Sequence, residues 1–156
     1  MTAGDHRLAA VEIDPASLAS ANAEIEHERR VAIFDLLEQN LFQPEGASGG
    51  PYSLRLSLEE SRLALAIDGP EFHKTHLLSL NPFKGIMKDY FMVCDSYHGA
   101  VRGASTSQIE AVDMGRRGLH NEGSDLLRER LQGKVEIDHE TARRLFTLIC
   151  ALYRRP

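Results

Sequence analysis

The chain contains no tryptophan, only two cysteines and no long hydrophobic run. Cys94 and Cys150 each stand without a nearby cysteine, which argues against a disulfide framework or a zinc knuckle and leaves two buried thiols as the expectation. No stretch approaches the roughly 20 apolar residues that a membrane span needs, and the first residues lack the apolar block of a secretory signal. We therefore expect a cytoplasmic protein that makes no membrane contact.

The chain does contain enough apolar material for a core. Hydrophobic residues make up 42% of its 156 residues and charged residues 26%, which is the balance of a soluble globular domain. Charge is uneven, because residues 115–156 hold nine of the 18 basic residues but six of the 23 acidic ones, within a net charge of −5. This cationic end would steer an anionic partner, yet it falls short of the basic balance of a dedicated nucleic-acid domain.

The first 80 residues show strand patterns with one helix among them. Asn22 offers an N-cap for that helix, which is expected to cover residues 24–42. Its apolar side is expected to consist of Ile25, Ile33, Phe34, Leu37 and Leu41. An apolar run precedes the helix, and three later segments show two-residue alternation or apolar runs between turn residues. The expected strands cover residues 8–13, 52–58, 62–67 and 74–80. We expect an antiparallel meander of the last three strands, which the first strand can join.

From residue 81 onward the apolar residues follow the period of a helix, and Tyr90, Tyr97 and Val101 belong to the apolar stripe of the first of these helices. Asn121-Glu122-Gly123 is expected to bend or end the second of these helices, and Ser124 to cap the third. The sequence leaves open whether residues 135–137 form a strand or a helix staple. Asp138 is expected to cap the last helix. The expected helices cover residues 82–101, 107–120, 125–132 and 139–153.

A run of strands followed by a run of helices predicts an α+β fold. We expect a single domain over residues 1–156, with a sheet-rich part at about residues 1–80 and a helical part at about 81–156. An antiparallel sheet of three or four strands would pack against a C-terminal layer of three to four helices. Because the segment LFTLICALY is apolar nearly all round, an exposed part of the last helix would also allow a homodimer.

The segment AVDMGRRGLHNEG, residues 111–123, carries the candidate site. At ~100° per residue along a helix, Asp113, Arg116 and His120 share a side with apolar residues, whereas Arg117 and Asn121 point away. Ionisable groups on an apolar face are costly unless they are paired. Gly115 and Gly118 are expected to let another backbone or a ligand approach this face closely. The three residues on the apolar side therefore either form a functional site or a polar seam of the core, and the sequence leaves both interpretations open.

On the functional interpretation, Arg116, Arg117, His120 and Asn121 bind a ligand. The leading hypothesis is a non-catalytic binding or regulatory module that recognises a protein partner or a small anionic ligand. The alternative is a small metal-independent hydrolase, in which His120 is the acid–base, Arg116 stabilises an anion and Asp113 orients the histidine. The leading hypothesis assigns no catalytic residue and expects no cofactor, and it leaves open whether the chain is an enzyme.

In the hydrolase alternative, the substrate under consideration is RNA. Arg116 and His120 are similar to the arginine–histidine pairs of helical ribonucleases of the HEPN type, which cleave RNA without metal, although the three residues between them are fewer than that motif needs. RNA binding also favours basic residues interleaved with exposed aromatics. The Arg-Arg pairs at 29–30, 116–117 and 143–144 instead follow acids at i,i+4 spacing, as on solvated helix faces. A nucleic-acid partner is therefore not the expectation.

Two carboxylate–histidine spacings resemble those of di-iron helical bundles, namely Glu24 with His27 and Asp95 with His98. Such a site needs further bridging carboxylates from other helices. The helix dipole already explains Glu24, because it lies in the first turn of a helix. We therefore expect no metal.

Five blocks of the chain resemble the bacterial uncharacterised protein family 0262: IEHERRVAIFDLLEQN, GGPYSLRLSL, MKDYFMVCDSY, TSQIEAVDMGRRGLHNEG and TARRLFTLICAL. The similarity runs almost from end to end. It implies a small cytoplasmic bacterial protein, and it transfers no catalytic residue.

Overall fold

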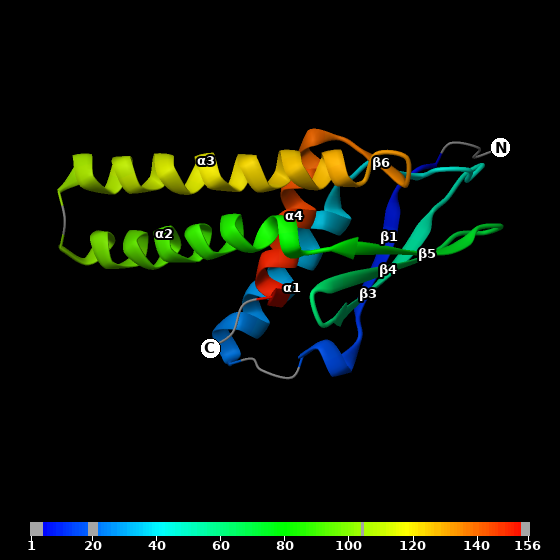
Figure 1. Cartoon of the computed structure of the whole chain (residues 1–156), viewed down its shortest axis with the longest axis horizontal. Helices are drawn as coiled ribbons and strands as arrows, with labels where there is room; N and C mark the ends of the chain where they lie inside the picture. The colour runs from blue at the N-terminus through cyan, green and yellow to red at the C-terminus, as the bar shows by residue number, and fades with distance from the viewer. Residues whose placement is uncertain (1–4, 19–21, 104, 154–156) are drawn as a thin grey trace.

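A β-sheet lies at one end of the molecule and a long helical hairpin extends from the other, with two further helices between them (Figure 1). The structure is a computed structural model, which describes residues 5–18, 22–103 and 105–153. Its strands are β1 (Leu8–Ile13), β2 (Phe42–Pro44), β3 (Tyr52–Glu59), β4 (Arg62–Asp68), β5 (His73–Ser79) and β6 (Val135–Ile137). Its α-helices are α1 (Ala23–Glu38), α2 (Lys84–Gly103), α3 (Thr106–Arg130) and α4 (His139–Tyr153), and short 3-10 helices cover Pro15–Leu18 and Asn81–Phe83.

The main sheet has the strand order β1-β3-β4-β5. Strands β3, β4 and β5 form the expected antiparallel meander. Strand β1 joins it, but runs parallel to β3, so the sheet is mixed instead of wholly antiparallel. The reason is the connection, because the chain passes through α1 between these strands and a parallel pair needs such a crossover. The predicted α+β class is confirmed.

One face of the sheet supplies much of the core. The alternating side chains Tyr52, Leu54 and Leu56 of β3 are buried, as are Leu63, Leu65 and Ile67 of β4. They belong to the same apolar cluster as Leu36 of α1 and Leu145, Phe146 and Ile149 of α4. The two-residue period of the strands therefore sets which side of the sheet α1 and α4 cover.

Asn40 ends α1 earlier than its sequence pattern suggests. Its side-chain amide donates to the carbonyl of Leu36 (2.9 Å) and to that of Leu8 (3.2 Å), and its Oδ1 accepts from the Leu8 N–H (2.7 Å). The chain then enters β2, which pairs antiparallel with β6. Residues 135–137, left open by the sequence, are thus a strand, and residues 42–44 pair with them because α1 has already stopped.

Helix α3 is continuous from Thr106 to Arg130, so the predicted break at 121–123 is wrong, as is the predicted cap at Ser124. The Ser124 hydroxyl donates to the His120 carbonyl one turn earlier (2.7 Å) and is buried inside the helix instead of starting a new one. Ser105 and Gln108 form a capping box at the true start of α3. At its 25 residues α3 is about 37 Å long, which makes the hairpin with α2 the longest feature of the molecule (Figure 1).

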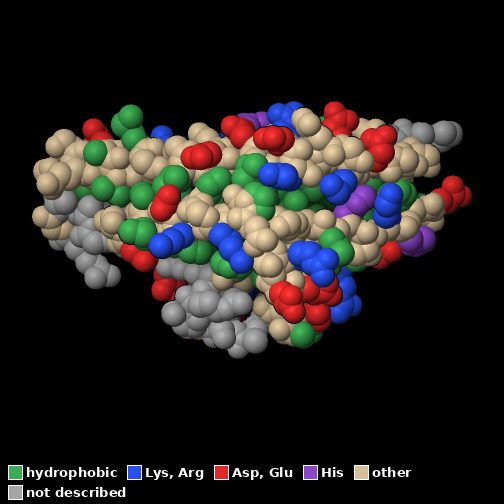
Figure 2. All heavy atoms as spheres, in the orientation of Figure 1, with side chains coloured by type: hydrophobic (Ala, Val, Ile, Leu, Met, Phe, Trp, Pro, Cys, Tyr) green, Lys and Arg blue, Asp and Glu red, His purple; other side chains and the backbone are tan. Residues whose placement is uncertain are grey.

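The hairpin exposes some apolar side chains. Met92 of α2 is 59% exposed and Met114 of α3 is 72% exposed. Figure 2 shows hydrophobic side chains in the seam between the two helices, with basic and acidic side chains intermixed on both sides of it.

The side chains of Tyr97 and Val101, expected in the apolar stripe of α2, lie outside the described residues. Among the helices that the structure describes, none combines the length and apolar character that crossing a membrane requires.

Helix α4 packs against α1 and α3. Asp138 caps it as predicted, because its Oδ1 accepts from the Thr141 N–H (2.8 Å). The apolar residues from Leu145 to Leu152 are all buried within the single chain. The exposed apolar surface on which a homodimer was expected is therefore not present on this part of α4, and the homodimer itself stays a prediction.

Candidate functional site

Asp113 lies between two arginines of its own helix. Its Oδ1 pairs with Nη2 of Arg116, three residues later, and its Oδ2 with Nη2 of Arg117, four residues later (2.9 Å). The hydrogen bond from Arg116 is the main reason why the pKa of Asp113 lies below its ordinary value. The Arg116 and Asp113 side chains are both partly buried, whereas that of Arg117 is 69% exposed. The division of α3 into an apolar side and an outward side is as the sequence predicted.

His120 is buried where α3 meets α4. Its Nε2 lies 2.7 Å from Oγ1 of Thr147, and its Nδ1 lies 3.5 Å from Oγ of Ser124. The Thr147 hydroxyl donates its proton to the Arg143 carbonyl (2.9 Å), so Nε2 of His120 must donate to Thr147. Burial, reinforced by the charges of Arg143 and Arg116, lowers the pKa of His120 to about 4. The ring is therefore neutral near pH 7.

Two aromatic rings enclose the imidazole. The Tyr90 ring from α2 lies 5.5 Å from it, and the Phe146 ring from α4 packs edge-on at 5.3 Å. Burial also raises the pKa of Tyr90 above its ordinary value, and the nearby Arg116 opposes this rise. Tyr90 and His120 thus form an aromatic floor beneath the arginines.

Above this floor is a hollow of ≈ 380 Å³ between α3 and α4, which we call the arginine pocket. Two adjacent arginines from each helix line it: Arg116 and Arg117 from α3, and Arg143 and Arg144 from α4. Tyr90, His120, Glu140 and Thr147 complete the lining. Arg143 pairs with Glu140 (3.6 Å), and Arg144 donates to the Gln39 carbonyl (2.5 Å).

Three of the four predicted ligand-binding residues line this pocket: Arg116, Arg117 and His120. The fourth, Asn121, lies exposed on α3 and is not part of the lining. Asp113 contacts the two arginines, while Nε2 of the His120 ring is engaged by Thr147. The geometry therefore places Asp113 as a partner of the arginines, not beside the histidine.

The sequence did not identify the α4 half of the pocket. Arg143 and Arg144 were interpreted as part of a solvated helix face, and Tyr90 as part of an apolar stripe. The signal that could have found them is the second Arg-Arg pair, one helix after the first. Only the packing of α3 on α4 shows that the two pairs face one hollow.

Gly115 and Gly118, beside these arginines, were expected to allow a close approach of backbone or ligand. No heavy atom of another part of the described chain would lie within 4 Å of a Cβ added at either position. Both glycines therefore face open space in this structure.

Within the described residues, no group of three or more histidine, cysteine, aspartate or glutamate side chains is placed to hold a metal ion. Glu24 and His27 are exposed on α1. The side chain of His98, from the second carboxylate–histidine spacing, lies outside the described residues.

Comparisons with known proteins bear on the chain as a whole. The model of the Uncharacterised protein family (UPF0262) matches residues 5–155. A UPF0262 protein of Caulobacter vibrioides is 62% identical over 151 residues, which cover 97% of this chain and 95% of the relative. A UPF0262 protein of Phenylobacterium zucineum is 59% identical over 150 residues, 96% of this chain and 94% of the relative. One of Rhizobium etli is 57% identical over 157 residues, 99% of each chain.

No solved structure matches the chain. The resemblance inferred from the five sequence blocks is confirmed, including its bacterial character. Since the names of the family and of these relatives state no activity, the function has to be argued from the geometry of the site.

Proposed function

The chain belongs to the Uncharacterised protein family (UPF0262), and we propose that it is a non-catalytic module that binds an anionic ligand in the arginine pocket. The observation that carries the proposal is the meeting of two Arg-Arg pairs from different helices around one hollow. Guanidinium groups bind phosphate and carboxylate in a bidentate manner, so pairs of arginines suit such ligands.

The charge balance of the pocket supports this proposal. Four guanidiniums line it with one carboxylate, that of Glu140. Asp113 adds a second negative charge beside the lining, and His120 adds no charge near pH 7 because of its lowered pKa. The hollow is therefore left with an excess of positive charge, which an anion would neutralise.

The surroundings of His120 favour binding over hydrolysis. A general acid–base needs a ring nitrogen within reach of the substrate and a pKa near the working pH. Nε2 of His120 is engaged by Thr147, and burial lowers the pKa of the ring to about 4. Asp113, the residue that would orient the ring in a hydrolase, has both carboxylate oxygens on arginines. These contacts suit a histidine that holds α4 against α3 and shapes the pocket floor.

Calorimetric titration with inorganic phosphate and pyrophosphate at low ionic strength tests the proposal. Arg117→Ala and Arg143→Ala should each weaken binding by roughly tenfold, the value of one charge-assisted hydrogen bond. Arg130→Ala is the matched control, because Arg130 is an exposed arginine of α3 outside the pocket. If neither anion binds, or if the control weakens binding as much as the pocket variants, the proposal fails. Turnover of a phosphoester or RNA that His120→Ala abolishes in a folded protein would instead support the hydrolase alternative.

A further inference from the structure

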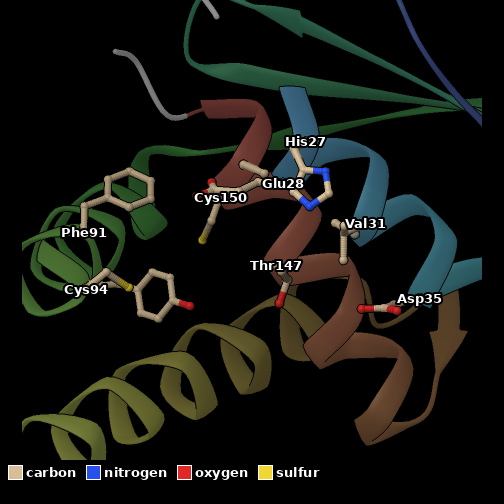
Figure 3. A pocket seen from close by; sticks show the side chains of 11 residues that line it. His27, Glu28, Val31, Asp35, Phe91, Cys94, Thr147 and Cys150 are labelled. Carbon is tan, nitrogen blue, oxygen red and sulfur yellow. The ribbon is translucent and has the colours of Figure 1, made fainter. Parts of the chain in front are cut away.

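A second hollow adjoins the arginine pocket. It has a volume of ≈ 340 Å³ and lies between α1, α2 and α4. Figure 3 shows Phe91 and Cys94 on one side of it, His27, Val31 and Asp35 on the other, and Cys150 and Thr147 from α4 between them. Cys150 is buried and Cys94 is half-buried. We call it the apolar pocket, since Val31, Ala32, Phe91, Cys94, Cys150 and Ala151 make up most of its lining.

The two pockets share two residues, Tyr90 and Thr147. Tyr90 interacts with Arg116 on the arginine side and with Cys94 on the apolar side. Thr147 is exposed, and its hydroxyl is already engaged by His120 and the Arg143 carbonyl. The wall between the pockets is thus a tyrosine and a threonine side chain, so a single molecule can contact both hollows.

The charges around the two pockets differ in sign. Arginines predominate in one, whereas the carboxylates of Glu28 and Asp35, both from α1, belong to the lining of the other. An anionic group is attracted to the arginine pocket and repelled by these carboxylates. The apolar residues that line the second pocket are suited to a group without charge. This arrangement favours one orientation of a ligand, with its charged end at the arginines.

We propose that the ligand is an amphiphilic anion, with a phosphate or carboxylate head in the arginine pocket and an apolar tail that passes Tyr90 and Thr147 into the apolar pocket. This inference rests on the proposed function, since it takes the arginine pocket as the head-group site. Both hollows are within the ~300–1,000 Å³ range of small-molecule sites. Together they accommodate a head and a tail of several carbon atoms.

A series of monoalkyl phosphates tests the tail directly. Methyl, butyl and octyl phosphate carry the same head, and each is used below its micelle concentration. Each methylene buried in the apolar pocket should tighten the dissociation constant by roughly threefold to fourfold. Octanoate measured beside octyl phosphate separates a preference for phosphate from a preference for carboxylate.

Val31→Glu tests where the tail lies. Val31 lines the apolar pocket and is 43% exposed, so a glutamate is tolerated on the surface while adding charge at the entrance. It should abolish the gain in affinity from methyl to octyl phosphate and leave methyl phosphate binding nearly unchanged. Phe34→Glu is the matched control on the same helix, because Phe34 is 67% exposed and outside the lining.

Two results overturn the inference, and they differ from failure of the anion site itself. If methyl and octyl phosphate bind equally well, and Arg143→Ala weakens both, the anion site stands and the tail pocket is wrong. If octyl phosphate binds more tightly but Val31→Glu and Phe34→Glu act alike, the tail lies elsewhere and the inference is equally wrong. If no phosphate in the series binds, both this inference and the proposed function fail.

Discussion

Gly123 of α3 lies so close to the Phe146 ring of α4 that a Cβ added at Gly123 would overlap the ring. Both residues are buried, and the Phe146 ring also packs on His120. The absent side chain at position 123 therefore fixes how closely the two helices that line the arginine pocket approach each other.

Gly123→Ala should destabilise the protein by about 1–3 kcal/mol, because the ring has to move within a packed core. Gly118→Ala provides the contrast on the same helix. A Cβ there meets open space, so alanine should stabilise the helix by about 0.5–1 kcal/mol. Chemical unfolding of the two variants beside the wild type measures both changes. Equal effects of the two substitutions would contradict the close approach at Gly123.

The pH dependence of stability should report on His120. Its pKa is about 4 in the folded protein, below its ordinary value of 6.5, because of burial. The unfolded chain therefore takes up a proton at this residue before the folded protein does. The contribution of the neutral ring to the free energy of unfolding is fully present above about pH 6.5. It is lost as the pH falls towards 4, and the loss is about 2 kcal/mol after allowance for solvent screening.

His120→Gln is the variant for this measurement, since glutamine does not titrate. The unfolding free energy of wild type and variant is compared from pH 7.5 to 4.5. The wild type should lose more stability than the variant across this range, while the other histidines contribute equally to both curves. Parallel curves would show that the His120 ring does not remain neutral in the folded protein.

Asp113→Asn should tighten anion binding. The carboxylate of Asp113 pairs with both Arg116 and Arg117, and its removal leaves the arginine pocket with one more net positive charge. Coulomb attraction over a few ångströms near a protein surface predicts a gain of about two- to fivefold in phosphate affinity. The gain should shrink as salt is added, because salt screens exposed charges. Weaker binding in this variant would mean that Asp113 positions the arginines for the ligand.

A further prediction concerns the contribution of Arg29 to the free energy of unfolding. It is 4% exposed, and its guanidinium donates to the carbonyls of Ala151 (3.1 Å) and Leu152 (3.2 Å) in the last turn of α4. Arg29→Met should cost about 3 kcal/mol of unfolding free energy, since it removes two charge-assisted hydrogen bonds to buried carbonyls. Arg30→Met, at the exposed neighbouring position, should change stability by less than about 0.5 kcal/mol. Thermal or chemical unfolding distinguishes them.

Local patterns predicted those parts of the fold that local forces decide. The alternation in β3 and β4, the caps at Asn22 and Asp138 and the side of α3 that faces inward all follow from residues close in sequence. The predicted break at 121–123 was wrong because Gly123 serves contact with Phe146, more than 20 residues away, instead of a turn. Phe34 was assigned to the core by its spacing, yet it is 67% exposed.

The candidate site shows the same division. Arg116, Arg117 and His120 could be found because they share one helix, and helical geometry places them relative to one another. Arg143 and Arg144 could not be assigned to the same pocket, since that requires the packing of α4 on α3. The parallel pairing of β1 with β3 was likewise beyond local pattern, because it depends on the path of the chain through α1.

The bonds from Arg29 to the last turn of α4 join segments 122 and 123 residues apart, and β2 meets β6 across most of the same distance. During synthesis, α1 and β2 thus leave the ribosome long before their partners exist. The face of α1 that α4 covers therefore stays exposed until α4 has emerged. Contacts between distant segments also slow folding in general, and the nascent chain passes through a period in which its first helix is open to chaperones and proteases.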